Sequence, residues 1–344
     1  MHVLVTGAGG FIGQELATAL ISCPNVTALT LTDVRQPSPP SIKVKPDHEV
    51  KISCVNADLT SNEACAKLFK PDVDVVYLLH GIMSGTAEEN LDVGLKVNFD
   101  STRQILDILR RVRHGIKVIY PSTLAVFGPS ARGEVMDERT IPIPGSSYGA
   151  QKLMCETLLN DYARRGLLDA RILRLPTVVV RPGQPSGAAS SFASAIIREP
   201  LKGEMSVLPV HSDLEMWICS PRTVVRNMIH ALDVPAASFE GATRVVNLPG
   251  LTVTVAQMLE ALRFVGGEEK VRLVEVKRDP AIEQIVAKWP SRFDTRWAKK
   301  LGFFDDGTLV DTIHAYIEEF GGNKEAENPI AIDPKADLVG GKAS

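Results

Sequence analysis

The sequence predicts an α/β fold in which a doubly wound parallel sheet is followed by a smaller C-terminal α/β lobe. In the first half of the 344 residues, short apolar runs alternate with helical patterns. Strands separated by helices in this way pair in parallel through right-handed crossovers. After about residue 175 the alternation loosens into PTVVVRPGQPSGAASS, a stretch rich in Pro, Gly and Ser that is typical of a loop.

The elements of the first half follow one another in a regular order. Strands are expected at His2–Val5, Ala28–Thr32, Val50–Asn56, Val73–Leu79, Lys117–Tyr120 and Ala170–Leu175. Helices are expected between them at Phe11–Ile21, Asn62–Leu68, Leu91–Val112 and Tyr148–Arg165. Several of the strands are apolar at nearly every position, which indicates central strands that helices cover on both faces.

The second half is less regular. We expect helices at Phe192–Ile197, Val255–Phe264 and Leu309–Phe320, and strands at Val245–Leu248 and Val271–Val276. The chain therefore divides into a first domain (1–175), a substrate-binding lobe that is partly interleaved with it (176–320) and a tail without periodicity (321–344).

Composition and charge exclude several classes of protein. A net charge of −3 provides no basic excess for nucleic-acid binding. No apolar run approaches the roughly 18 residues of a membrane span, and the first residues, MHVLVTG, lack the basic start of a signal peptide. The five cysteines are scattered and show no metal-ligand spacing. We expect a cytoplasmic protein without a metal site, a nucleic-acid partner or a membrane partner, whose substrate is a small molecule.

A glycine-rich loop follows the first strand and opens the first helix. Gly7, Gly10 and Gly13 have the GxxGxxG spacing, which allows a tight turn and close approach of a pyrophosphate to backbone N–H groups. The positive end of the helix dipole favours the same anion. We expect contacts to a dinucleotide from Gly7, Gly9, Gly10, Phe11, Ile12 and Gly13. A plain turn would also contain glycines, but the strand–loop–helix context favours a dinucleotide site in a Rossmann-type domain.

Asp33 ends the second strand, where such domains carry the acid that binds the adenosine ribose. A carboxylate at this position repels the 2′-phosphate of NADP, so the predicted cofactor is NAD. Arg35 lies two residues further on and leaves NADP as an alternative.

Tyr148 and Lys152 are four residues apart on an expected helix and therefore share one face. A nearby ammonium stabilises a phenolate and allows tyrosine to act as a base at lower pH. The hydroxyls of Ser122 and Thr123 follow the strand at Lys117–Tyr120, where open α/β sheets bind their ligands. Together these residues indicate removal of a hydroxyl proton while hydride leaves the same carbon.

With these residues assembled, the chain resembles the extended short-chain dehydrogenase/reductase superfamily, in its NAD-dependent epimerase/dehydratase group. The resemblance rests on TGAGGFIG, KVNFDSTR, PSTLAVFG and YGAQK, in that order, within roughly residues 1–320. It implies catalytic roles for Thr123, Ser122, Tyr148 and Lys152. It also implies cofactor contacts at Asp58, Leu59, Leu79, His80, Gly81, Asn98, Tyr148, Lys152, Pro176 and Thr177, and a homodimer formed through the helices at 91–112 and 148–165.

A narrower resemblance is to the dehydrogenases of four-carbon sugar acids such as D-erythronate. It implies oxidation of a 2-hydroxyl to a 2-oxo acid. A carboxylate substrate requires a cation, for which the candidates are Arg174, Arg181, Arg198 and Arg222. The expected substrate contacts are Ser84, Ser122, Thr123, Tyr148, Arg181, Ser190 and Arg198. His80, where the group usually has alanine, and Ser186-Gly187 depart from the pattern.

Two other functions remain open. A nucleotide-sugar 4-epimerase would use the same Thr–Tyr–Lys set but needs a long cleft for its nucleotide. A non-catalytic NAD-binding regulator would not need that set at all. Leu124 and Ala125 follow Thr123 where dehydratases of the group have Asp-Glu, which disfavours dehydration.

Overall fold

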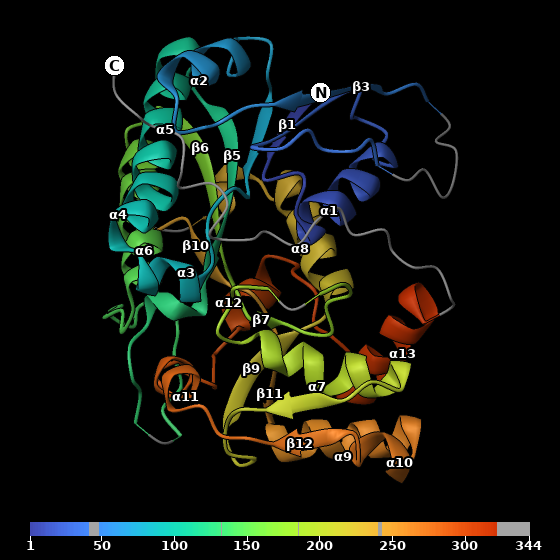
Figure 1. Cartoon of the computed structure of the whole chain (residues 1–344). Coiled ribbons are helices and arrows are strands. Elements are labelled where there is room, and N and C mark those ends of the chain that lie inside the picture. The colour runs from blue at the N-terminus through green and yellow to red at the C-terminus, as the bar shows by residue number, and fades with distance from the viewer. Residues whose placement is uncertain (41–47, 132, 185, 240–242, 322–344) are drawn as a thin grey trace, which may run out of the picture.

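Seven parallel strands form the central sheet of the computed structural model, which describes residues 1–40, 48–131, 133–184, 186–239 and 243–321 (Figure 1). The strand order is β10-β6-β5-β4-β1-β2-β3. The strands are β1 (His2–Thr6), β2 (Ala28–Asp33), β3 (Lys51–Asn56), β4 (Val75–Leu78), β5 (Ile116–Thr123), β6 (Leu168–Leu175) and β10 (Val245–Asn247). The predicted doubly wound parallel sheet is confirmed, and most of its strand boundaries shift by one to three residues.

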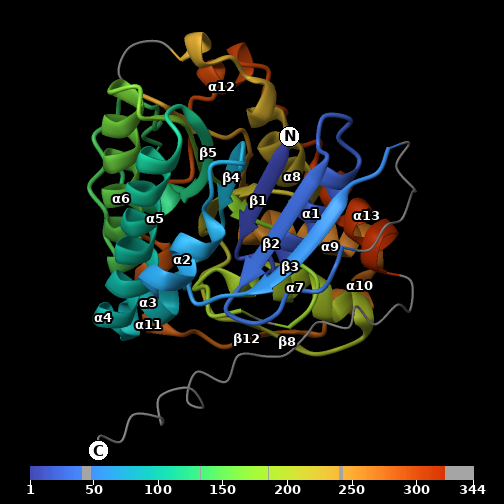
Figure 2. The same cartoon turned by 90° about the horizontal axis from the view of Figure 1, so that it is seen from above.

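Helices cover both faces of this sheet (Figure 2). One layer contains α2 (Asn62–Leu68), α5 (Ser101–Val112) and α6 (Ser147–Arg164); the other contains α1 (Phe11–Ile21) and α8 (Pro221–Asp233). The alternation of side chains along β1 supplies both cores. Leu4 packs in the core beneath α5 and α6, whereas Val3 and Val5 pack in the core beneath α1 and α8.

The expected helix Leu91–Val112 is interrupted. It consists of α4 (Leu91–Gly94), a π-helical segment η1 (Leu95–Asp100) and α5, and a further short helix, α3 (Ser84–Glu89), precedes it. The sequence pattern did not predict the π-helical turn or α3. Short π-helical segments often occur at functional sites, and η1 carries Asn98.

The second half contributes a lobe with two small sheets. One has the order β11-β9-β7 and the other pairs β12 with β8. The strands are β7 (Thr177–Val178), β8 (Ser206–Leu208), β9 (Glu215–Cys219), β11 (Leu251–Thr254) and β12 (Val274–Val276). The helices are α7 (Ser191–Lys202), α9 (Val255–Gly266), α10 (Glu268–Val271), α11 (Pro280–Val286), α12 (Arg296–Lys300) and α13 (Leu309–Phe320). Short 3-10 turns occur at η2 (Leu124–Val126) and η3 (Ala236–Ser238).

Two elements of the second half return to the large sheet. β10 pairs in parallel with β6, and α8 packs beside α1. The expected strand at 245–248 is therefore present, but as the edge of the large sheet. The expected strand Val271–Val276 is wrong in its first part, because Val271 ends α10.

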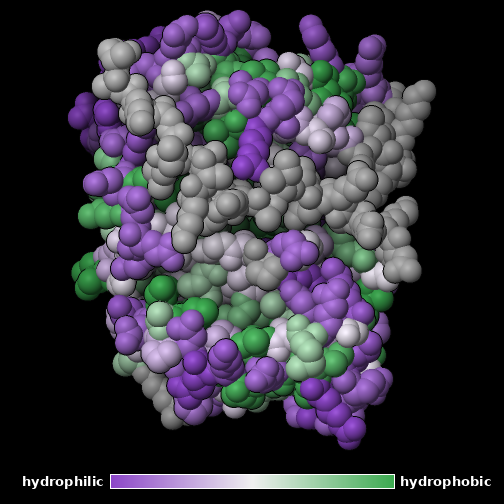
Figure 3. Space-filling model, in the orientation of Figure 1, coloured by the Kyte–Doolittle hydropathy of each residue, from purple (hydrophilic) through white to green (hydrophobic). Residues whose placement is uncertain are grey.

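Hydrophilic residues cover much of the face in Figure 3, with hydrophobic residues in smaller groups between them. None of the helices in the described ranges is long and apolar enough to cross a membrane. The predicted tail lies outside the described residues from 322 onward.

Candidate active site

The glycine loop joins β1 to α1 at the carboxyl end of the sheet. Gly7 has a φ of 65°, which favours glycine, and a Cβ there would lie 2.7 Å from the backbone nitrogen of His80. A Cβ on Gly13 would collide with the Gly7 carbonyl oxygen. Gly10 precedes α1 and offers no side chain to cap its first N–H groups. The loop thus combines close packing with uncapped helix donors, which is the donor set that a pyrophosphate requires.

Asp33 lies beside this loop. Its Oδ2 accepts a hydrogen bond of 2.9 Å from the Gly9 N–H, and a Cβ on Gly9 would lie 3.2 Å from the same oxygen. Ala57 donates its N–H to the Asp33 carbonyl, so the segment with Asp58 and Leu59 follows alongside. Leu59 is buried, and Asp58 Oδ1 accepts from the Thr60 N–H. The Gly9 loop, Asp33 and the segment after β3 therefore lie side by side at one end of the sheet.

His80 connects three elements. Its Nδ1 lies 2.9 Å from Oγ1 of Thr6 and its Nε2 lies 2.8 Å from Oγ of Ser101. Because Ser101 donates its hydroxyl to the Val97 carbonyl, it accepts the Nε2–H of His80. Burial lowers the pKa of His80 to about 3, so the imidazole is neutral. Both ring nitrogens therefore have protein partners. The ring is thus not free to bind a cofactor, and the predicted cofactor contact would come from the backbone of Leu79, His80 and Gly81.

Asn98 has its whole side chain engaged. Oδ1 accepts from the Ile82 N–H at 2.8 Å, while Nδ2 donates to the Ile82 carbonyl and, at 2.8 Å, to Gln151 Oε1. It therefore holds the segment after β4 against α6. The sequence predicted a cofactor contact for Asn98 and did not select Gln151, whose part in this clamp only the packing reveals.

Tyr148 and Lys152 lie on the first turns of α6, which Ser146 caps by accepting the Gly149 N–H. Burial lowers the pKa of Lys152 to about 8 and raises the pKa of Tyr148 to about 12. Any Cβ at Gly149 would meet the Ala125 carbonyl oxygen. This glycine brings the helix close to η2, the turn that follows Thr123.

Thr123 and Ser122 point to opposite faces of β5. Thr123 Oγ1 accepts from the Ala125 N–H at 3.1 Å, which leaves its own hydroxyl proton available for a ligand. Ser122 instead donates its hydroxyl to Glu156 and is 4% exposed. The structure disagrees with the predicted catalytic and substrate roles of Ser122, because its hydroxyl is directed into a buried side-chain pair.

The four candidate arginines have different surroundings. Arg174 forms a fork with Glu156, at 2.7 Å between Nη2 and Oε2, and exposed Arg222 pairs with Glu319. Neither of these candidates suits a substrate carboxylate, because each already has an acidic partner. Arg198, 2% exposed, donates to the Arg181 carbonyl at 2.7 Å and pairs with Glu199, so its predicted substrate contact is also disfavoured.

Arg181 is the exception. Its backbone N–H donates to Ser194 Oγ and its carbonyl accepts from Arg198. Among the described residues, no acidic group pairs with its guanidinium. Burial and the neighbouring charge of Arg198 lower the pKa of Arg181 to about 10, so it stays cationic at neutral pH. An anion would complete this environment.

The lobe meets the first domain near Ser84 and Ser190. Ser84 begins α3, and its Oγ accepts from the Ala189 N–H at 3.2 Å. Gly85 donates its N–H to the Gly187 carbonyl. Ser84 and Ser190 are both buried, and Pro176 and Thr177 lead from β6 into β7. In the described ranges, no group of three His, Cys, Asp or Glu side chains could hold a metal ion.

Known proteins resemble this chain over most of its length. The model of the NAD dependent epimerase/dehydratase family matches residues 3–249. A D-erythronate dehydrogenase of Haemophilus influenzae is 41% identical over 92% of this chain and 99% of its own, and one of Cupriavidus necator is 39% identical over 93% and 99%. A solved structure described as a nucleoside-diphosphate-sugar epimerase from Agrobacterium tumefaciens is 35% identical, with a TM-score of 0.86 over 94% of this chain and 95% of its own.

Proposed function

The chain belongs to the NAD-dependent epimerase/dehydratase family, and from this membership we propose that it oxidises the 2-hydroxyl of a small sugar acid such as D-erythronate. The product is the corresponding 2-oxo acid. Two relatives that match over nearly their whole length are D-erythronate dehydrogenases. We propose that this chain shares their substrate class.

The observation that carries the proposal is the guanidinium of Arg181, which has no acidic partner among the described residues. A carboxylate on the substrate would supply the missing charge and accept two parallel hydrogen bonds. Arg198 holds the backbone of Arg181 in place and does not compete for that carboxylate. Ser84 and Ser190 are the candidates for binding the sugar hydroxyls.

NAD fits the glycine loop described above. Gly7, Gly9, Gly10, Phe11, Ile12 and Gly13 would hold its pyrophosphate, and Asp33 would accept from its adenosine ribose. The carboxylate of Asp33 disfavours the 2′-phosphate of NADP. When bound, NAD supplies the acceptor for the two electrons removed from the substrate carbon. In this proposal residues 1–175 bind the cofactor and most of 176–320 binds the acid.

The remaining chemistry belongs to three side chains. Thr123 donates its free hydroxyl proton to the reacting oxygen and orients it. Tyr148, as phenolate, removes the proton of the substrate hydroxyl. Lys152, one turn along α6, stabilises that phenolate with its positive charge. This charge matters because burial by itself raises the pKa of Tyr148 to about 12.

The test is to incubate the purified protein with NAD and D-erythronate and to follow NADH by its absorbance. We expect steady production of NADH, lost in Tyr148→Phe and retained in Tyr162→Phe, a matched change further along the same helix. Interconversion of UDP-sugars, with no NADH from any sugar acid, would contradict this proposal. That result would favour the 4-epimerase, the alternative that the sequence left open and that matches the description of the Agrobacterium structure.

We further propose a cytoplasmic homodimer formed through α5 and α6. Exposed apolar side chains on this side of the molecule include Leu91 and Met154. Light scattering on the purified protein measures the mass directly. A dimer that Met154→Glu converts to a monomer supports the proposed interface, and a monomeric wild-type protein contradicts it.

A further inference from the structure

The proposed catalytic side chains are divided between two elements. Thr123 ends β5, whereas Tyr148 and Lys152 lie on α6. Their geometry therefore depends on how this strand end is held against this helix. Ser122 makes that connection by donating its hydroxyl to Oε1 of Glu156, at 2.5 Å.

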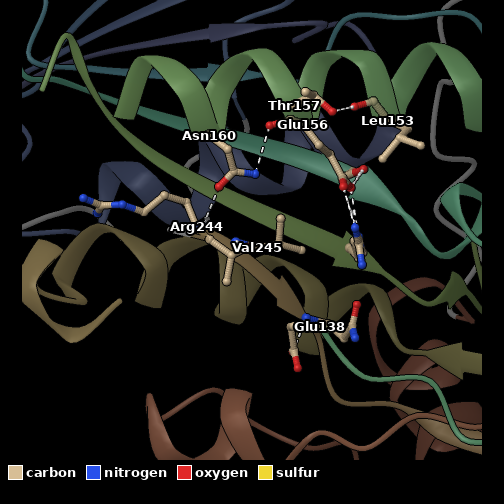
Figure 4. A network of polar contacts seen from close by, with 11 residues as sticks. Glu138, Leu153, Glu156, Thr157, Asn160, Arg244 and Val245 are labelled. Atoms are coloured by element: carbon tan, nitrogen blue, oxygen red, sulfur yellow. Dashed lines mark hydrogen bonds and ion pairs between the residues drawn. The ribbon is translucent and has the colours of Figure 1, made fainter. Parts of the chain in front are cut away.

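Glu156 has the right place for such a connection. It follows Lys152 by one helical turn, as Lys152 follows Tyr148, so the three share one face of α6. In Figure 4 its carboxylate points from α6 toward the strand beneath, where dashed lines reach a guanidinium. That guanidinium belongs to Arg174, whose Nε and Nη2 donate to Glu156 at 3.0 and 2.7 Å.

Arg174 anchors the carboxylate from a third element. It lies on β6 in register with Ser122 on β5 and with Asn247 on β10. Its guanidinium carbon lies 4.7 Å from the centroid of the Phe127 ring. Glu156 and Arg174 are 2% and 5% exposed, so their ion pair is shielded from water and cannot rearrange freely.

We propose that Glu156 is a positioning residue, which ties Ser122 to α6 and thereby sets the place of Thr123 relative to Tyr148 and Lys152. Successive side chains of a strand point to opposite faces. Holding Ser122 on the buried face therefore presents Thr123 on the other. The proposal rests on the dehydrogenase function for its kinetic consequence, but the tether itself is a property of the protein alone.

Ser122→Ala removes only this tether and leaves the Glu156–Arg174 pair intact. The matched control is Asn160→Ala. Asn160 lies one turn beyond Glu156 and accepts the Arg244 N–H at 2.6 Å, so it ties the same helix to the start of β10 (Figure 4). Its Nδ2 donates to the backbone carbonyl of Glu156 within the helix and does not contact the Glu156 carboxylate.

We expect faster amide hydrogen exchange at residues 122–127 in Ser122→Ala and wild-type exchange there in Asn160→Ala. With a sugar acid, kcat of Ser122→Ala falls by about tenfold to 10²-fold, the scale of a small misplacement of reacting groups, while the Kd for NAD stays within about twofold. Unchanged exchange at 122–127 in Ser122→Ala overturns the proposal, and so does a kcat no lower than that of Asn160→Ala. If wild-type protein oxidises no sugar acid, the dehydrogenase proposal fails. The exchange measurement still shows whether Ser122 holds the end of β5 against α6.

A second variant tests Glu156 directly. Glu156→Asp keeps a negative charge on α6 but shortens the side chain, which withdraws the carboxylate from Ser122 and also lengthens its bonds to Arg174. We expect its effects on kcat and on exchange at 122–127 not to add to those of Ser122→Ala, because both changes remove the same contact. Additive effects in the double variant contradict a shared tether.

Discussion

The ammonium nitrogen of Lys152 lies 3.9 Å from the centroid of the Tyr120 ring. Both side chains are buried, at 7% and 1% exposed. The negative face of an aromatic ring attracts a cation, and the attraction strengthens where water is excluded. Tyr120 on β5 thus stabilises the ammonium group of Lys152, which we propose activates Tyr148. The burial of Lys152 also makes its positive charge costly.

The cost of burying Lys152 predicts a pH dependence of stability. Burial lowers its pKa in the folded protein to about 8, below the ordinary lysine value of 10.5. Between these values the unfolded state binds more protons, so this group makes stability rise with pH from 8 to 10.5. Urea unfolding without NAD should show this rise, and Lys152→Met should lack it. A difference between the two proteins that does not change with pH would contradict the shifted pKa.

His80 should destabilise the protein in acid. Burial holds the pKa of His80 near 3, below the ordinary histidine value of 6.5, so the unfolded state binds more protons between these values. Its contribution to stability is lost as the pH falls from 6.5 to 3, by up to about 1.4 kcal/mol per pH unit. His80→Asn should weaken this dependence in urea unfolding, whereas His211→Asn at an exposed site should not. Equal slopes for wild type and His80→Asn would show that His80 is not the group involved.

Asp33 should control the choice of cofactor. Asp33→Ser removes the negative charge that repels a 2′-phosphate. It also removes an acceptor of hydrogen bonds from the ribose hydroxyls. We expect weaker binding of NAD and a ratio of NADP to NAD affinity that rises by about tenfold or more, equivalent to about 1.4 kcal/mol. Calorimetric titration of both cofactors measures this ratio, with Asp72→Ser, at an exposed carboxylate in the turn before β4, as control. An unchanged ratio would assign the preference to another residue.

Arg181 should govern the binding of the acid. Arg181→Met removes a cation that we propose to be hydrogen-bonded to the substrate carboxylate, at a cost of about 2 to 5 kcal/mol. The KM for D-erythronate should rise by about 30-fold or more, the lower end of that cost, while the Kd for NAD stays the same. Arg222→Met, at an exposed arginine with its own acidic partners, is the control. If both variants have the wild-type KM, the carboxylate binds elsewhere.

Local patterns predicted much of the fold. The alternation of apolar runs and helical segments placed the first six strands of the large sheet, because a strand buried on both faces needs little beyond its own composition to be identified. The bounds of α1 and α2 were predicted to the residue, and α13 was predicted at its place in the chain. The same reasoning missed η1, since a π-helical turn has no distinct hydrophobic period, and it assigned β10 no place in the sheet because pairing between distant strands leaves no local signal.

The sequence by itself determined the glycine loop, Asp33, and the spacing of Tyr148 and Lys152, because each depends on neighbours a few residues away. Only the tertiary structure decided what the polar side chains do. Arg174 and Arg181 look alike in the sequence, yet Glu156 on α6 pairs with the first, and no acidic residue in the described ranges pairs with the second. Ser122 and Thr123 are adjacent hydroxyls that the fold turns to opposite faces. Such roles depend on partners brought together by packing, and on the cost of leaving a buried charge unpaired.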